Sequence, residues 1–274
     1  MSEKQIPIPE IAQERGMTRL VFEDDFDSLD TIDLYGTGDK KYKWYTTRPF
    51  RATPLTPDDF RIENSVLYLE QHDSLYNYGL CTYNPRVRRG FSFNKGVLEF
   101  RFRIPHYYED KTKYSVPDCG GPAIWSFPID KIQDTAGEWV EMDWMEYWGT
   151  YDGRFPEGYY TTTLHHSRRE NMHQFNTFIA NNATRRGVGC ITDAEWHTMT
   201  FLWDDGILQS WFDGMPSVVQ RYGAEEGPDP KATIKGELPL NKIYTPMDIQ
   251  HLPLIINGAK NNPLEIDWIR VWQK

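Results

Sequence analysis

The stretch that most clearly indicates the fold is Val97–Ile104, which reads VLEFRFRI. Its apolar residues, from Leu98 to Ile104, occupy every second position, and charged residues fill the positions between them. Successive side chains of an extended chain point to opposite faces, so this alternation predicts a β-strand with one buried face and one solvated face.

Similar segments recur along the chain and are separated by short turn motifs. The further strand candidates are Leu20–Phe26, Val66–Gln71, Trp139–Tyr147, Tyr160–His165, His197–Trp203, Ile207–Phe212, Leu252–Ile256 and Ile266–Trp272. The turn motifs are Asn94-Lys95-Gly96, Asp204-Asp205-Gly206, Asp213-Gly214 and Asn257-Gly258. No helical pattern runs longer than two or three turns. The sequence therefore predicts an all-β sandwich of two packed antiparallel sheets.

Length and composition favour a single domain of a particular kind. The 274 residues contain no internal repeat or flexible linker, so we expect one domain over 19–274, preceded by a loose arm over 1–18 with a short helical turn at Pro9–Arg15. The net charge of −10 argues against nucleic acid or an anionic membrane as a partner. Aromatic residues make up 15% of the chain, as in β-proteins that handle carbohydrate.

Cysteines and terminal segments exclude several other classes. The three cysteines, Cys81, Cys119 and Cys190, form no CxxC pair and cannot all pair with one another, so neither a disulfide framework nor a zinc knuckle is expected, although one bridge stays open. No apolar run is long enough to span a membrane. The start, Met1–Gly16, has no apolar signal-peptide region, so a secreted protein without its leader and a cytoplasmic protein would look alike.

The candidate chemistry lies in residues 137–150, GEWVEMDWMEYWGT, which contain Glu141, Asp143 and Glu146. Because 40 of the 274 residues are acidic, this spacing alone is expected about once by chance. The context is more informative, since three carboxylates stand among bulky apolar residues, where like charges are costly to bring together or desolvate. Two readings are open at this point: a catalytic set, or a solvated strand edge or cation site.

Strand geometry distinguishes these carboxylates further. In a regular strand Glu141 and Asp143 share a face, whereas Glu146 points the other way. One bulged residue, Trp144 or Met145, would return Glu146 to that face. The two glutamates would then be four strand steps apart, about 13 Å between Cα atoms. Side chains leaning toward each other would leave about 5–6 Å between carboxyl groups, which favours a retaining over an inverting glycosidase.

Each carboxylate has a chemical role in such a reaction. One must be ionised to attack the sugar carbon, and the other must carry a proton for the leaving oxygen. Asp143 between them would repel a second negative charge and so raise the pKa of the acid, while a shared proton would orient the nucleophile. Spacing alone does not say which glutamate is which.

At this point the sequence resembles glycoside hydrolase family 16, whose signature is E-x-D-x-x-E on a bulged strand. The resemblance extends over nearly the whole chain after Leu20, in segments that occur in the family's order: LVFEDDF (Leu20–Phe26), FSFNKGVLEFRFRIP (Phe91–Pro105), GPAIWSFP (Gly121–Pro128), TLHH (Thr163–His166), EWHTMTFLW (Glu195–Trp203), WFDG (Trp211–Gly214) and His251–Trp272.

The resemblance implies a β-jelly roll with a concave sugar-binding cleft and endo-acting, retaining hydrolysis without a catalytic cofactor. It makes Glu141 the nucleophile, Asp143 its supporting carboxylate and Glu146 the acid/base. The five-residue spacing is similar to the bulged branch of laminarinases, agarases, porphyranases and carrageenases. The chain departs from the family at Met142 and Trp144, which replace small aliphatic residues, and in a long loop over 106–120.

The resemblance also implies residues around the catalytic set. Trp125 resembles the tryptophan beneath the sugar beside the cleavage point, and Trp148 is a second platform candidate. His165 resembles the histidine beside the acid/base, although the adjoining His166 cannot face the same way. Arg86 aligns with an arginine that binds sugar hydroxyls. Asp267 is the candidate ligand for a structural calcium of the kind that family members hold on the convex side.

We therefore expect a polysaccharide-binding monomer, extracellular or periplasmic by the resemblance, that is an endo-β-glycanase acting on β-1,3- or β-1,4-linked chains. Laminarin-type glucan is the first substrate expected. A sulfated galactan such as agar or porphyran is the alternative, because arginines can pair with sulfate. A non-catalytic carbohydrate-binding protein and a transglycosylase are further alternatives that the sequence leaves open.

Overall fold

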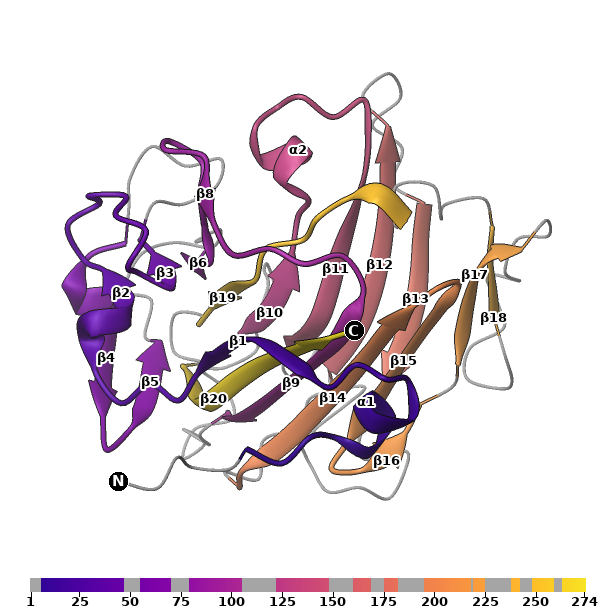
Figure 1. Ribbon diagram of the computed structural model, residues 1–274, viewed down its shortest axis with the longest axis horizontal. Coiled ribbons are helices and arrows are strands. Elements are labelled where there is room, and N and C mark those ends of the chain that lie inside the picture. The colour runs from indigo at the N-terminus through magenta and orange to yellow at the C-terminus, as the bar shows by residue number, and fades with distance from the viewer. Residues whose placement is uncertain are drawn as a thin grey trace, which may run out of the picture.

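Two β-sheets packed face to face form the body of the protein (Figure 1). The computed structural model describes residues 6–46, 55–69, 79–104, 122–147, 160–168, 175–181, 195–217, 219–224, 238–241, 248–258 and 263–274. Within these ranges the chain is mostly strand, and its few helices are short. The architecture is a β-sandwich of the jelly-roll type, as the alternating pattern predicts.

The first sheet has ten strands in the order β18-β17-β15-β14-β9-β20-β5-β4, with β1 pairing with β20 and β16 with β15. Its strands are β1 (Arg19–Asp24), β4 (Phe60–Glu63), β5 (Val66–Leu69), β9 (Gly96–Arg103), β14 (His197–Asp204), β15 (Ile207–Phe212), β16 (Met215–Pro216), β17 (Gln220–Ala224), β18 (Leu238–Asn241) and β20 (Leu264–Gln273). Its pairs are antiparallel apart from β17–β18 at one edge.

The second sheet has eight strands in the order β13-β12-β11-β10-β19-β6-β3-β2. They are β2 (Ile32–Asp33), β3 (Trp44–Tyr45), β6 (Leu80–Cys81), β10 (Ala123–Ser126), β11 (Glu138–Tyr147), β12 (Tyr160–Arg168), β13 (Phe175–Asn181) and β19 (Ile255–Asn257). Only the edge pair β2–β3 is parallel among them. The predicted carboxylate strand, β11, is therefore interior to this sheet.

Short elements connect the strands. Strands β7 (Tyr83–Asn84) and β8 (Arg89–Gly90) form a separate hairpin. The helices are α1 (Glu10–Glu14), α2 (Ile129–Ile132) and two 3₁₀ turns, η1 (Leu29–Thr31) and η2 (Pro57–Asp59). At the turn between β15 and β16, Asp213 and Gly214 have φ angles of 47° and 77°, the left-handed conformation that the Asp-Gly pair predicts.

The core lies between the two sheets and is rich in aromatic rings. Phe100 of β9, Trp144 of β11 and Phe201 of β14 are almost fully buried and belong to one apolar cluster. The ring of Trp144 is stacked with that of Phe93 at 5.9 Å and meets Phe201 edge-on at 5.6 Å. Most of the chain's aromatic residues that the structure describes therefore pack the interior.

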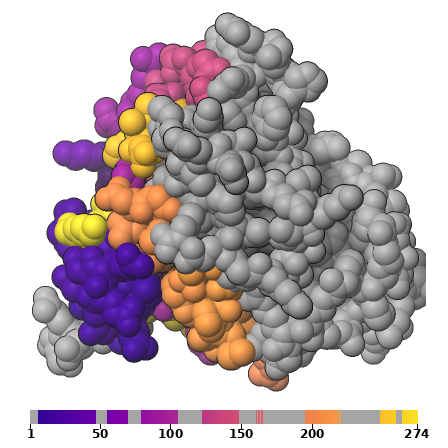
Figure 2. All heavy atoms as spheres, turned by 90° about the vertical axis from the view of Figure 1, so that its right-hand side faces the viewer, coloured from indigo at the N-terminus to yellow at the C-terminus, as the bar shows by residue number. Residues whose placement is uncertain are grey.

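The N-terminal arm packs against the other face of the ten-stranded sheet. Ala12 and Met17 are buried in a cluster with Val97, Leu202 and Trp272, which lie on β9, β14 and β20. Figure 2 shows the arm, in indigo, against the orange residues of the sheet. The helical turn predicted at Pro9–Arg15 is present as α1, but the described arm is anchored, because its apolar side chains cover a surface that would otherwise meet water.

In the described ranges, no helix has both the length and the apolar character that crossing a bilayer would require.

Candidate active site

Strand β11 contains a bulge at the position that the sequence predicts. Against β12, Asp143 pairs with Thr163 and Glu146 with Thr161, so two residues of β11 face one residue of β12. Against β10, Asp143 pairs with Trp125 and Met145 with Ile124, which leaves Trp144 as the additional residue. The prediction of one bulged residue between Asp143 and Glu146 is therefore confirmed.

Burial shows what the bulge does to the two faces of β11. Val140, Met142 and Trp144 alternate into the core, and Met145, directly after Trp144, is also in the core. Two consecutive inward residues can occur only where the alternation is interrupted. Glu146 consequently falls on the same face as Glu141 and Asp143, away from the core.

The register also sets the spacing of the two glutamates. Glu141 pairs with His165 and Glu146 with Thr161. Their partners are four residues apart on β12, which corresponds to about 13 Å along the strand. Glu141 and Glu146 are half-buried, and Asp143 between them is 6% exposed. These three carboxylates therefore form one row along the outer face of the eight-stranded sheet.

Trp125 of β10 lies directly opposite Asp143 on this outer face. It belongs to a second apolar cluster, with Cys81, Ala123 and Ile255 from neighbouring strands and Ile132 from α2. Its indole Nε1 donates a hydrogen bond of 2.7 Å to Oδ1 of Asn257, and its ring meets Phe127 edge-on at 5.1 Å. The indole is thus held at the carboxylate row, with 6% of its surface exposed.

The outer face beside Trp125 is shielded from water. Burial raises the pKa of the Cys81 thiol to about 12, so this cysteine is neutral and has no nucleophilic role at neutral pH. Burial also raises the pKa of Tyr83, while a hydrogen bond from Gln133 lowers it. Apolar packing therefore bounds the carboxylate row on the β10 side.

Gln250, which the sequence does not single out, anchors the start of β11. Its side-chain amide donates to the carbonyl of Glu138 at 2.8 Å and accepts from the amide of Val140 at 3.2 Å. The side chain is 5% exposed, so both bonds are shielded from water. Glu141 follows directly on this clamped segment. A residue about 110 positions away along the chain gives no local sequence signal for such a contact.

Comparison with solved structures relates this architecture to known proteins. A laminarinase from Flavobacterium sp. UMI-01 superposes with a TM-score of 0.55, covering 93% of this chain and all of that one, at 16% identity. A family 16 glycoside hydrolase from Bacteroides ovatus, solved with a product of mixed-linkage glucan, gives a TM-score of 0.54 over 91% of this chain and 99% of that one, also at 16% identity. The chain has the fold of glycoside hydrolase family 16.

Other comparisons limit what the family 16 fold implies here. No protein-family model matches the sequence, and no curated protein matches it. A structure of endo-acting O-glycanases from the human gut microbiota, which initiate mucin breakdown, superposes equally well, with a TM-score of 0.55 over 93% of this chain and all of that one at 17% identity. Proteins with this fold therefore act on more than one kind of glycan.

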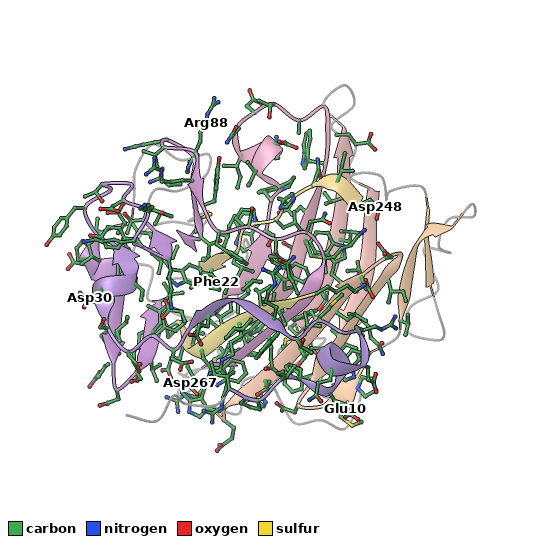
Figure 3. All side chains as sticks on the ribbon, viewed as in Figure 1. Glu10, Phe22, Asp30, Arg88, Asp248 and Asp267 are labelled. Carbon is green, nitrogen blue, oxygen red and sulfur yellow. The ribbon has the colours of Figure 1, made fainter. Side chains whose placement is uncertain are left out.

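The remaining binding residues expected from the family 16 resemblance are placed only in part. His165 occupies the register position opposite Glu141, and its side chain lies outside what the structure describes. Trp148 also lies outside the described residues. Arg86 is exposed in the turn between β7 and β8, where its amide donates to Oδ1 of Asn84. Figure 3 shows Arg88, in the same turn, at the outer edge of the protein.

Asp267 of β20, the candidate calcium ligand, has a cationic side chain as a partner among the described residues. Its carboxylate forms an ion pair with the guanidinium of Arg101 on β9, and Asp267 itself lies at an irregularity of the β9–β20 register. Its label in Figure 3 lies at the opposite edge of the protein from that of Arg88. The described ranges contain no group of three or more His, Cys, Asp or Glu side chains suited to a metal. Calcium binding at Asp267 stays a prediction that these surroundings do not favour.

Proposed function

We propose that the protein is a retaining endo-β-glycanase that hydrolyses a β-1,3- or β-1,4-linked polysaccharide, with laminarin-type glucan as the first substrate to test. The observation that carries the proposal is the bulge in β11, which brings Glu146 onto the face of Glu141 at a spacing suited to retention. The likeness to endo-glucanases in fold supports it. Trp125 lies opposite Asp143, so its indole borders the surface that a sugar bound at the carboxylate row would cover.

The mechanism assigns one role to each carboxylate. Ionised Glu141 attacks the anomeric carbon, while Glu146 donates its proton to the oxygen of the leaving chain as that bond breaks. Glu146, now ionised, removes a proton from water, whose oxygen attacks the same carbon and releases Glu141. Asp143 lies between the two and is nearly buried, so its charge disfavours a second negative charge and helps to keep Glu146 protonated.

The decisive experiment measures new reducing ends on laminarin, mixed-linkage glucan, agar and porphyran. We expect the wild type to release oligosaccharides of several sizes, as endo cleavage requires, and to release the β-anomer first in proton NMR. Glu141→Gln and Glu146→Gln should each lose nearly all turnover, whereas Glu138→Gln on the same strand should keep it. Normal turnover in Glu141→Gln would overturn the assignment.

A sulfated galactan is the second candidate substrate. Arg86 and Arg88 on the β7–β8 turn and Arg89 at the start of β8 are all exposed, and guanidinium groups bind sulfate with paired hydrogen bonds. Turnover confined to agar or porphyran would favour this candidate over glucan. Binding without turnover on every glycan would support a non-catalytic carbohydrate-binding protein. Products longer than the starting oligosaccharide would indicate a transglycosylase.

We further propose that the protein works as a monomer, either outside the cell or in the periplasm. A substrate too large to enter a cell requires an enzyme that meets it outside. Fractionation of the native source and the elution volume of the purified protein test these two points.

A further inference from the structure

Thr162 of β12 is the single residue that faces the two-residue bulge of β11. The register pairs its neighbours Thr163 and Thr161 with Asp143 and Glu146, which leaves Thr162 opposite Trp144 and Met145. Its hydroxyl donates a hydrogen bond of 2.8 Å to the carbonyl oxygen of Trp144. Thr162 is 1% exposed, so water does not compete for this bond.

The other side of the bulge is fixed through the same tryptophan. The indole Nε1 of Trp144 donates a hydrogen bond of 2.9 Å to the hydroxyl of Ser126 on β10. Ser126 and Trp144 are both fully buried. A bulge interrupts the backbone ladder, so its peptide groups need partners from elsewhere. Thr162 supplies such a partner to the Trp144 carbonyl from β12, while Ser126 on β10 holds the Trp144 side chain.

We propose that Thr162 is a positioning residue for the acid/base, because its hydroxyl sets the orientation of the peptide group two residues before Glu146. This inference rests on the proposed function. Glu141 is held independently, since Gln250 clamps the start of the strand. Loss of the Thr162 hydroxyl therefore moves one glutamate relative to the other. Because a retaining reaction requires a set distance between them, chemistry suffers more than substrate binding.

Thr46 offers a matched control elsewhere in the same sheet. It directly follows β3, is also 1% exposed and donates a hydrogen bond of 2.9 Å from its hydroxyl to the carbonyl of Asp33. Thr46→Val removes the same kind of bond as Thr162→Val, four sheet positions from β11. The two variants should therefore lose similar stability and differ in catalysis.

The experiment compares Thr162→Val, Thr162→Ser and Thr46→Val with the wild type. We expect Thr162→Val to lower kcat about tenfold to a hundredfold with little change in KM, which is the size of effect that a displacement of about 1 Å produces. Thr162→Ser restores the hydroxyl and should keep kcat near the wild-type value. Thr46→Val should keep kcat even where its melting temperature falls.

Hydrogen exchange of the backbone amides separates this proposal from the proposed function. In Thr162→Val the amides of Met145 and Glu146 should exchange faster than in Thr162→Ser, whether or not a substrate is known. A wild type without turnover on any glycan would defeat the proposed function and leave the exchange result to judge Thr162. Unchanged exchange in Thr162→Val, or an equal fall in kcat for Thr46→Val, would overturn the positioning role.

Discussion

Shortening Glu141, the proposed nucleophile, by one methylene tests the spacing of the two glutamates directly. The partners of Glu141 and Glu146 on β12 are four residues apart, which gives about 13 Å between their Cα atoms and about 5–6 Å between their carboxyl groups. Glu141→Asp withdraws the carboxylate by about 1.5 Å, one carbon–carbon bond. The gap becomes about 7 Å, within the range of inverting enzymes.

The expected result is a fall in kcat of about a hundredfold, because the carboxylate starts about 1 Å or more from its attacking position. This loss corresponds to about 2.7 kcal/mol of barrier. The assay is initial-rate release of reducing ends at saturating glycan, with the anomer of the first product followed by NMR. Glu138→Asp, which shortens a side chain at the start of the same strand, is the control and should keep the wild-type rate.

A Glu141→Asp variant that keeps more than about a third of wild-type kcat would refute the reasoning, since the distance between carboxylates would then not limit attack. A substantial rate with inverted product would also be informative. It would show that a water molecule fits in the widened gap and that Glu141 acts as a base there.

Two further predictions concern the ten-stranded sheet. The side chain of Glu265 is only 6% exposed and forms an ion pair with Arg103. Arg103→Met leaves the buried charge of Glu265 unpaired and should lower the free energy of unfolding by about 3 kcal/mol, whereas Arg103→Met/Glu265→Met removes both charges and should lower it much less. In a protein of 274 residues, a loss of this size lowers the melting temperature by about 5 °C. Equal losses in the single and the double variant would contradict the prediction. Burial raises the pKa of Glu99, while a hydrogen bond from Thr200 and the charge of Arg270 lower it. Because the pKa of Glu99 is higher in the folded state, the wild type loses stability as the pH rises above the unfolded-state pKa of about 4.5. Glu99→Gln has no such carboxyl group, so its melting temperature should rise relative to that of the wild type as the pH increases from 4 to 7. An advantage of Glu99→Gln that shrinks between pH 4 and pH 7 would contradict a raised pKa for Glu99.

The bulge was predictable because two different requirements meet in a few residues. Apolar Trp144 and Met145 both pack in the core, whereas Asp143 and Glu146 on either side of them must stay on the outer face of the sheet. A regular strand cannot satisfy both requirements, and one bulged residue at Trp144 or Met145 does. The alternation in Val97–Ile104 predicts β9 for the same reason, because each apolar residue there has only one face to occupy.

Contacts between distant segments were not predictable. Trp125 is placed on the outer face as expected, but the sequence does not reveal that Phe127 and Ile132 pack around it and leave 6% of it exposed. Thr162 acts through its register position, and register depends on the pairing of whole strands. The ion pair of Asp267 with Arg101, which stands 166 residues earlier on another strand, also has no local sequence signal. Each of these features depends on which strands are neighbours.

The pairing of β1 with β20 has a mechanical consequence. Arg19, at the start of β1, lies beside Gln273, at the end of β20, in an antiparallel pair. A force that pulls these two ends apart acts across the ladder at one end, so the hydrogen bonds carry the load one pair at a time rather than together. After the arm around α1 detaches, the sandwich should therefore unfold at low force by separating β1 from β20 one hydrogen-bonded pair at a time. Strand β11, in the interior of the other sheet, then still carries no load.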